Sequence, residues 1–354
     1  MKTSKVIVLT VIFGIIVSFL ISFFIGLEQT LNALAKANLF FLFIAFLFNW
    51  LSILCINQRW RMVVKSAGIK VSNNLLLLAT LSGVAFSNIT PSSRMGGEPI
   101  KAYFLNKFGK TNTKHSFATI VGERLFDSIT FTIVALSVLV FVLVSGSLPL
   151  YLFLILVFTV LLALAVTVII TFISINSKTR IKLIKWSLGK FKWLIKKLKQ
   201  YEEFEAKVIE DSEKYSKNIR KFLKNKYLWV VCVYYSLLVW AFDVLRIYFV
   251  FLALGVNVQL HVILTAIVLS AVAGALPFLP GGLGAIETTM IGAYSASGIS
   301  LVVAGVGTLI DRFISYWLFS FIGLVSSYYL KRRLKHDYKL GSSKRSKRRE
   351  VRRN

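Results

Sequence analysis

Long apolar stretches alternate with short polar ones along this chain of 354 residues. About 20 consecutive apolar residues let a helix cross the hydrocarbon core of a bilayer. Six stretches approach or exceed that length, and each predicts a membrane-spanning helix. They cover Val6–Ile25, Leu39–Ile56, Phe117–Val144, Leu150–Ile173, Tyr227–Leu254 and Val302–Leu330.

The first stretch follows Lys2 and Lys5, as the apolar core of a secretory signal would. A signal has a shorter apolar core and a small-residue cleavage site after it. We therefore interpret Val6–Ile25 as an uncleaved first span.

Two further apolar stretches are interrupted by glycine and proline. Leu75–Ile89 is followed by a segment with two prolines and two glycines at 91–99, and Val262–Phe278 runs into Pro277–Gly284 before Ala285–Gly298. Proline and glycine interrupt helices. Each stretch therefore predicts a helical hairpin that enters the membrane and turns back.

The basic residues are distributed unevenly and predict the orientation. The chain has 43 Lys and Arg against 15 Asp and Glu, a net charge of +28. Of the 43, 39 lie at the N-terminal tip or in the segments Asn57–His115, Asn176–Lys226 and Lys331–Asn354. Cytoplasmic loops carry the excess of Lys and Arg. Both termini are therefore expected in the cytoplasm, with one hairpin entering from each face of the cell membrane.

The composition, 56% hydrophobic and 16% charged, excludes a soluble or disordered chain. The basic loop 176–226 is predicted to be helical, and the basic tail 331–354 to be disordered. Both are expected to contact anionic headgroups at the cytoplasmic face. Nucleic acid is not expected as a partner. The oligomeric state stays open.

The polar residues inside the apolar stretches occur twice with the same spacing. Pro91 precedes Glu98 by 7 residues, and Pro280 precedes Glu287 by 7. An acid–arginine pair then follows in each half, Glu123–Arg124 and Asp311–Arg312. Opposite insertion of two such halves is the mark of an inverted-topology repeat. Repeat one is expected to cover about 38–144, and repeat two about 227–330.

Two helix ends inside the membrane would form an anion site. Such ends carry free N–H groups and a positive dipole end, and guanidinium groups bind phosphate in a forked geometry. Glycines allow a ligand to approach the backbone closely. The candidate substrate-binding residues are Arg124, Arg312, Arg246, Glu98, Glu287, Gly96, Gly97, Gly281, Gly282, Gly284, Asp127 and Asp311. The variants Arg124→Ala and Arg312→Ala are expected to fold but to lose translocation of the substrate.

Structural roles compete with this interpretation. Arg124 and Asp127, and Asp243 and Arg246, are spaced as i,i+3 ion pairs that could simply neutralise buried charge. Glu98 and Glu287 could instead cap the hairpin helices. Arg59 lies near the predicted cytoplasmic end of its span, where it could anchor to headgroups.

Motifs for other chemistry are missing from the sequence. It contains no phosphate-binding loop of the ATPase type and no nucleophile elbow. Its two cysteines and three histidines are too scattered for a metal site. No enzymatic activity, catalytic residue, metal or cofactor is therefore expected.

Four segments resemble the transmembrane region of the lysylphosphatidylglycerol synthase/flippase family. They read NITPSSRMGGEPIKAYFL (88–105), ERLFDS (123–128), LPFLPGGLGAIE (276–287) and DRFISYW (311–317). The resemblance implies a membrane domain that translocates an aminoacylated phospholipid made by a separate soluble domain. Other members resemble fusions with a glycosyltransferase. This chain has neither extra domain, so lysyl transfer is not expected.

The sequence therefore predicts an all-α polytopic membrane protein with six full spans plus two re-entrant helical hairpins arranged as an inverted-topology repeat. Residues 1–330 would form a flippase-like transmembrane domain. Its expected function is to move an anionic or phosphate-bearing lipid between leaflets. The alternatives are a carrier of a soluble anion and a non-catalytic partner of a lipid-modifying glycosyltransferase or synthase.

Overall fold

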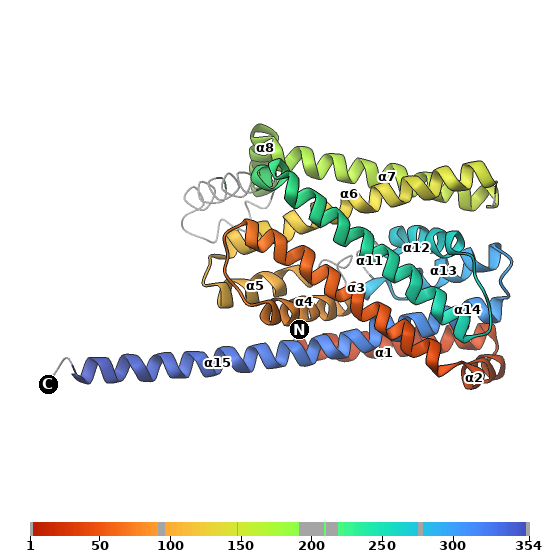
Figure 1. Ribbon diagram of the computed structural model, residues 1–354, viewed down its shortest axis with the longest axis horizontal. Helices are drawn as coiled ribbons and strands as arrows, with labels where there is room; N and C mark the ends of the chain where they lie inside the picture. The colour runs from red at the N-terminus through yellow and green to blue at the C-terminus, as the bar shows by residue number, and fades with distance from the viewer. Residues whose placement is uncertain are drawn as a thin grey trace.

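The computed structural model describes residues 3–90, 96–146, 148–190, 209, 219–274 and 279–351. Within these ranges every regular element is helical, and the helices pack as an elongated bundle (Figure 1). An all-helical architecture suits a chain in the bilayer, because each helix satisfies its own backbone hydrogen bonds.

Five continuous helical stretches are long and apolar enough to cross a membrane. Helix α1 and the shorter α2 bend by 100° and count as a sixth span if taken together. Gly26 lies at this bend with φ 107°, in the left-handed region that favours glycine. The bounds are α1 Thr3–Ile25, α2 Leu27–Lys36, α3 Leu39–Ser66, α6 Thr113–Ser145, α7 Leu150–Ile175 and α11 Lys226–Ala253, with α14 Leu301–Arg312, the π-helix η2 Phe313–Leu318 and α15 Phe319–Val351 as the last stretch.

Two pairs of shorter helices stand where the sequence predicts hairpins. The first pair is α4 (Asn73–Ile89) and α5 (Glu98–Gly109). The second is α12 (Leu260–Gly274) and α13 (Ala285–Ala296), with the short 3₁₀ turn η1 (Pro280–Gly282) between them. The pairs occupy opposite halves of the bundle along its long axis (Figure 1).

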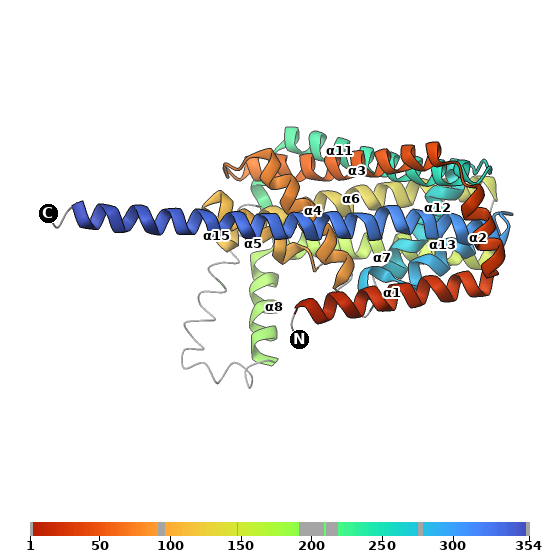
Figure 2. The same cartoon turned by 90° about the horizontal axis from the view of Figure 1, so that it is seen from below.

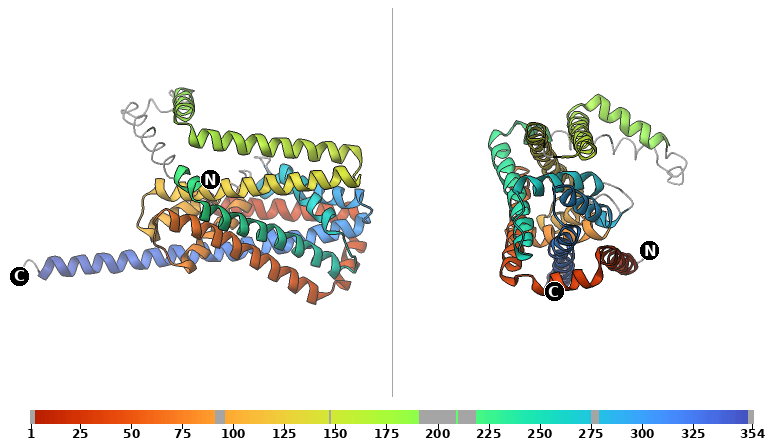
Figure 3. Two further views of the ribbon diagram at one scale, coloured as in Figure 1. Left: turned by 45° about the horizontal axis from the view of Figure 1, so that its top comes forward. Right: turned by 90° about the vertical axis from the view of Figure 1, so that its right-hand side faces the viewer.

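Helices α3 and α11 lie side by side and run antiparallel through the bundle (Figures 1 and 3). At one end the Asn38 N–H donates to the Ala253 carbonyl at 2.9 Å. Between them, the Phe48 ring stacks on Phe249 with centroids 5.4 Å apart. The equivalent first spans of the two predicted repeats are therefore in direct contact.

The two ends of the bundle differ in charge. The start of α1, the helix α8 (Ser177–Lys190) and the extension of α15 lie toward one end, and α2 lies at the other (Figure 2). Helix α8 runs across the long axis of the bundle (Figure 2). The basic segments are thus grouped at one end. Residues 191–208 and 210–218 of the predicted basic helical loop lie outside the described residues.

Helix α15 does not end near Leu330, where the sequence predicts a disordered tail to begin, but continues to Val351. Lys and Arg are good helix formers, and no proline interrupts residues 319–351. A helix already formed by packing in the bundle extends at little cost, because each further residue adds a hydrogen bond without a new nucleus.

Candidate functional site

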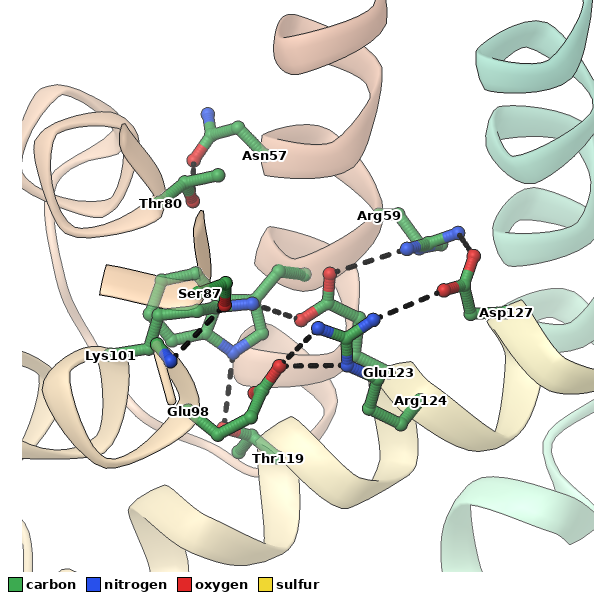
Figure 4. Close-up of polar contacts among 12 residues, drawn as sticks. Asn57, Arg59, Thr80, Ser87, Glu98, Lys101, Thr119, Glu123, Arg124 and Asp127 are labelled. Atoms are coloured by element: carbon green, nitrogen blue, oxygen red, sulfur yellow. Dashed lines mark hydrogen bonds and ion pairs between the residues drawn. The ribbon is translucent and has the colours of Figure 1, made fainter. Parts of the chain in front are cut away.

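The first polar cluster surrounds Arg59 on α3 (Figure 4). The Arg59 guanidinium donates to Asp127 at 2.7 Å and to Glu123 at 3.4 Å, both on α6. It also donates to Ser236 Oγ on α11 at 2.8 Å. Arg59 is buried, so the expectation that it anchors to headgroups is wrong: its partners on α6 and α11 hold it inside the bundle.

Helix α5 of the first hairpin contributes two more charges to this cluster (Figure 4). The Glu98 carboxylate, at the start of α5, accepts from Arg124 Nε at 2.7 Å and from a second nitrogen of the same guanidinium. One turn later, Lys101 pairs with Glu123 and lies over the Trp60 ring, 4.5 Å from its centroid. These contacts tie the hairpin to α3 and α6.

The second polar cluster surrounds Arg246 on α11. Its guanidinium donates to Asp311 on α14 at 2.7 Å and to Asp243 on α11 at 2.6 Å. It also donates to Asn49 Oδ1 on α3 at 2.9 Å. Arg246, like Arg59, therefore joins three helical elements through one buried side chain.

Helix α13 of the second hairpin joins this cluster through Glu287. Arg312 Nε donates to Glu287 at 2.6 Å and a terminal nitrogen donates to the Gly281 carbonyl at 3.2 Å. The second Glu287 oxygen accepts from the Gly284 N–H at 2.7 Å, so Glu287 caps α13. The Arg312 guanidinium also lies 4.6 Å from the centroid of the Tyr316 ring.

The two clusters use the same pairing scheme. In each cluster an arginine on α3 or α11 pairs with the acid of the adjacent acid–arginine pair. The arginine of that adjacent pair binds the glutamate at the start of a hairpin helix. The matching bonds are Arg59–Glu123 with Arg246–Asp311, and Glu98–Arg124 with Glu287–Arg312.

The contacts between α3 and α11 are also reciprocal. Asn49, ten residues before Arg59, binds Arg246, and Ser236, ten residues before Arg246, binds Arg59. Two antiparallel helices that exchange equivalent contacts are what a two-fold relation between the halves would produce.

The end of α4 meets the last span through Asn88 and Tyr316. The Tyr316 hydroxyl donates to the Asn88 carbonyl at 2.9 Å, and Asn88 Nδ2 donates to Ser320 Oγ at 2.9 Å. A Cβ on Gly281 would lie 2.8 Å from the Asn88 carbonyl oxygen. The end of α4 therefore touches η1 of the other hairpin. Tyr316 lies in η2, and π-helical turns are frequent at functional sites.

The glycines of the predicted site approach protein atoms. A Cβ on Gly97 would lie 1.9 Å from the Gly83 carbonyl oxygen, and one on Gly282 would lie 2.9 Å from Gly274 Cα. At Gly97, Gly281 and Gly282 packing within and between the hairpins requires glycine, and close approach of a ligand at these positions stays a prediction. A Cβ on Gly284 would lie 3.9 Å from Val17 Cγ1, an ordinary van der Waals distance. Gly96 is partly exposed.

The candidate arginines differ in exposure. The Arg124 side chain is 46% exposed, whereas those of Arg246 and Arg312 are each 9% exposed. The partner of Arg124 in α6, Asp127, lies 3.4 Å away and is also partly exposed. Arg124 is thus the candidate arginine that an incoming anion can reach with little rearrangement.

The structure brings together the charged residues that the sequence selected, in two clusters rather than one. Sequence reasoning left Arg59, Lys101 and Asn49 outside the site. The similar spacing of Arg59 from Pro91 (32 residues) and of Arg246 from Pro280 (34 residues) was a usable signal for Arg59. The position of Lys101, three residues after Glu98, was another such signal. Among the described residues, no group of three or more His, Cys, Asp or Glu side chains could hold a metal ion.

These observations define a multi-pass helical membrane protein with buried ion-pair clusters at the ends of two helical hairpins. A family model for the lysylphosphatidylglycerol synthase TM region matches residues 11–323, and the chain belongs to this family.

The chain is also similar to membrane proteins of several archaea. It is 31% identical over 326 residues to a UPF0104 membrane protein of Methanocaldococcus jannaschii, covering 90% of this chain and 95% of the relative. It is 28% identical over 316 residues to a UPF0104 membrane protein of Methanothermobacter thermautotrophicus, covering 89% and 93%. A third, of Pyrococcus horikoshii, is 25% identical over 319 residues, covering 89% and 94%.

Proposed function

We propose that this protein is a lipid translocase, without enzymatic activity, that moves an anionic or phosphate-bearing lipid between the leaflets of the cell membrane. The observation that carries the proposal is the half-exposed guanidinium of Arg124 within a membrane span. Arg124 lies within the apolar helical stretch His115–Ser145, nine residues after its start. A charge so placed is functional by default.

The proposed binding step is an exchange of partners at Arg124. Two of its N–H donors bind one oxygen of the Glu98 carboxylate, and two oxygens of a phosphate could accept from the same two donors. A lipid phosphate would displace Glu98 and free the start of α5 to move. Arg312, buried against Glu287, would hold the second hairpin while the first opens. The lipid tails would stay in the bilayer.

The proposal includes six full spans and two re-entrant hairpins related as an inverted repeat, with both termini cytoplasmic. Its support is the matched pairing scheme of the two clusters and the contact between Asn88 at the end of α4 and Gly281 in η1. Single cysteines at Lys36, Lys70, Lys110 and Lys178 test this arrangement with a membrane-impermeant maleimide.

We expect the cysteines at positions 70, 110 and 178 to react from the cytoplasmic side, and the cysteine at position 36 from the other side. Positions 70 and 110 flank the first hairpin, so a shared side means that the hairpin turns back. The buried Cys55 and Cys232 give the background labelling of the wild type. Labelling of positions 70 and 110 from opposite sides would contradict re-entrance.

Translocation is tested in proteoliposomes that contain an acidic fluorescent phospholipid, by quenching the label in the outer leaflet. We expect Arg124→Gln to slow translocation roughly 10- to 100-fold, the equivalent of a charged hydrogen bond of about 1.5–3 kcal/mol. Arg332→Gln, an exposed arginine of α15, is the matched control and should behave as wild type.

Equal rates for Arg124→Gln and the wild type would remove Arg124 from the site. Competition by a water-soluble phosphate compound would favour a carrier of soluble anions. Absence of translocation by the wild type would favour the accessory role, in which the protein is the membrane partner of a separate glycosyltransferase or lipid synthase.

A further inference from the structure

The two clusters differ in formal charge although their pairing schemes match. The first contains three carboxylates, Glu98, Glu123 and Asp127, and three cations, Arg59, Lys101 and Arg124. The second contains three carboxylates, Asp243, Glu287 and Asp311, but two cations, Arg246 and Arg312. Among the described side chains, the second cluster therefore has one carboxylate in excess.

The excess carboxylate of the second cluster follows from a missing cation at one position of the proposed repeat. Lys101 lies three residues after Glu98, and the residue three after Glu287 is the buried Met290. In the first cluster Glu123 and Asp127 each have two cationic partners. In the second, Asp243 and Asp311 share the single guanidinium of Arg246. Two carboxylates on one cation inside a membrane leave an uncompensated charge, which is costly at low dielectric.

The groups around Asp243 identify where this charge can be neutralised. Helix α3 supplies two neutral side chains, Ser52 beside Asp243 and Asn49 beside Arg246, α14 supplies Asp311, and α13 supplies the buried phenol of Tyr294. In the described parts of α6 and α12, no charged side chain is ion-paired to Asp243. Glu287 is already compensated by Arg312 and the Gly284 N–H.

We infer that Asp243 is the proton-binding site of the second cluster, and that the lipid crosses the membrane together with a proton. The inference rests on the proposed function. The Asp243 side chain is 29% exposed against 4% for Asp311, so Asp243 is the carboxylate that can exchange a proton with water. A proton from the solvent forms an O–H bond on the Asp243 carboxylate, and that bond breaks when the proton leaves on the other side.

The geometry gives the proton a mechanical consequence. A protonated Asp243 releases its charged bond to Arg246 within α11, and the guanidinium is then free to change its position relative to Asp311 on α14 and Asn49 on α3. An anionic headgroup and a proton together carry no net charge through the low-dielectric interior, so both move in the same direction.

The test uses the full chain in proteoliposomes with an acidic fluorescent phospholipid and a pH gradient of either sign. We expect the wild type to move the labelled lipid faster when the leaflet it leaves faces the more acidic solution than when that leaflet faces the less acidic one. Asp243→Asn should translocate at the same rate in both gradients. Glu28→Gln, the same type of change at an exposed acid of α2, should keep the gradient dependence. Should Asp243→Asn not fold, Met290→Lys supplies the missing cation and should also remove the dependence.

A second readout does not depend on transport. Infrared difference spectra of the wild type between high and low pH should contain a carboxylic-acid carbonyl band that Asp243→Asn lacks. Translocation that ignores the pH gradient, or that follows a sodium gradient instead, would overturn the proton site and leave the proposed function standing. If the wild type does not translocate at all, the proposed function fails, and the infrared band alone then supports or overturns proton binding by Asp243.

Discussion

Arg312→Ala is expected to lower the stability of the folded protein by about 3–5 kcal/mol, the usual cost of leaving one partner of a buried ion pair alone. The substitution removes the 2.6 Å bond to Glu287, the bond to the Gly281 carbonyl and the contact with the Tyr316 ring. Glu287 would keep a single backbone N–H in a site where its side chain is 3% exposed. Thermal unfolding of the purified protein in detergent measures the loss.

Two variants separate unpaired charge from lost packing. Glu287→Gln combined with Arg312→Ala removes the unpaired carboxylate, so this double variant should recover most of the stability. Arg332→Ala, in the exposed part of α15, should melt within about 0.5 kcal/mol of wild type. An Arg312→Ala protein that melts like the wild type would show that the pair contributes nothing to the fold.

Arg124→Ala should be milder, because the Arg124 side chain is 46% exposed and less of it is packed against protein than that of Arg312. The sequence treats Arg124 and Arg312 as equivalent, since both follow an acid and both lie about 25 residues after a hairpin glutamate. Only the packing around the two arginines in the folded protein distinguishes them. Loss of transport by an Arg312 variant therefore reports on folding first, and Arg124 is the sharper probe of ligand binding.

The elements themselves were largely predictable. Apolar length predicted the spans, and proline and glycine predicted the breaks at 91–99 and 277–284, because both signals are local. The bend between α1 and α2 was missed: α2 is amphipathic and short, and nothing in its own sequence fixes its angle to α1. The tail was predicted as disordered from charge alone, although α15 supplies a formed helix for it to continue.

The charged residues of the site were predictable by type and spacing but not by partner. Spacing along one helix suggested that Arg124 pairs with Asp127 and Arg246 with Asp243, and both contacts are present. The shorter Arg124 contact, however, is with Glu98 on another helix. Arg59 was assigned to the membrane surface because it lies near the end of an apolar stretch, and its partners on α6 and α11 depend on packing that this position does not reveal.

The proposed inverted repeat would explain why these partners recur. When two halves insert in opposite directions, each first span meets its counterpart, and a polar residue ten positions before each arginine reaches the arginine of the other half. Such reciprocal bonds tie the halves together at two points along α3 and α11. Motion between the halves would have to break both. Motion of the first hairpin would break the bonds of Glu98 and Lys101 instead, and motion of the second would break the bond of Glu287.

Gly97→Ala is expected to destabilise the protein by about 1–3 kcal/mol, the usual cost of overpacking, and to push α5 away from α4. A Cβ at this position would lie 1.9 Å from the Gly83 carbonyl oxygen and 2.5 Å from Ser87 Oγ. Neither neighbour can move freely. The Gly83 carbonyl belongs to the backbone of α4, and Ser87 Oγ accepts a hydrogen bond from the Gly97 N–H at 3.1 Å. Displacement of α5 would also pull Glu98 away from Arg124, so translocation should fall together with stability.

Gly292→Ala is the matched control for this prediction. Gly292 lies inside α13, and a Cβ on it would meet no atom of another helix within 4 Å, so alanine fits there. Alanine also restricts the unfolded chain, so this variant should melt as the wild type does or be more stable by up to about 1 kcal/mol. Thermal unfolding of both variants in one detergent decides the matter. Equal melting of Gly97→Ala and Gly292→Ala would mean that the first hairpin is not packed as closely as its glycines indicate.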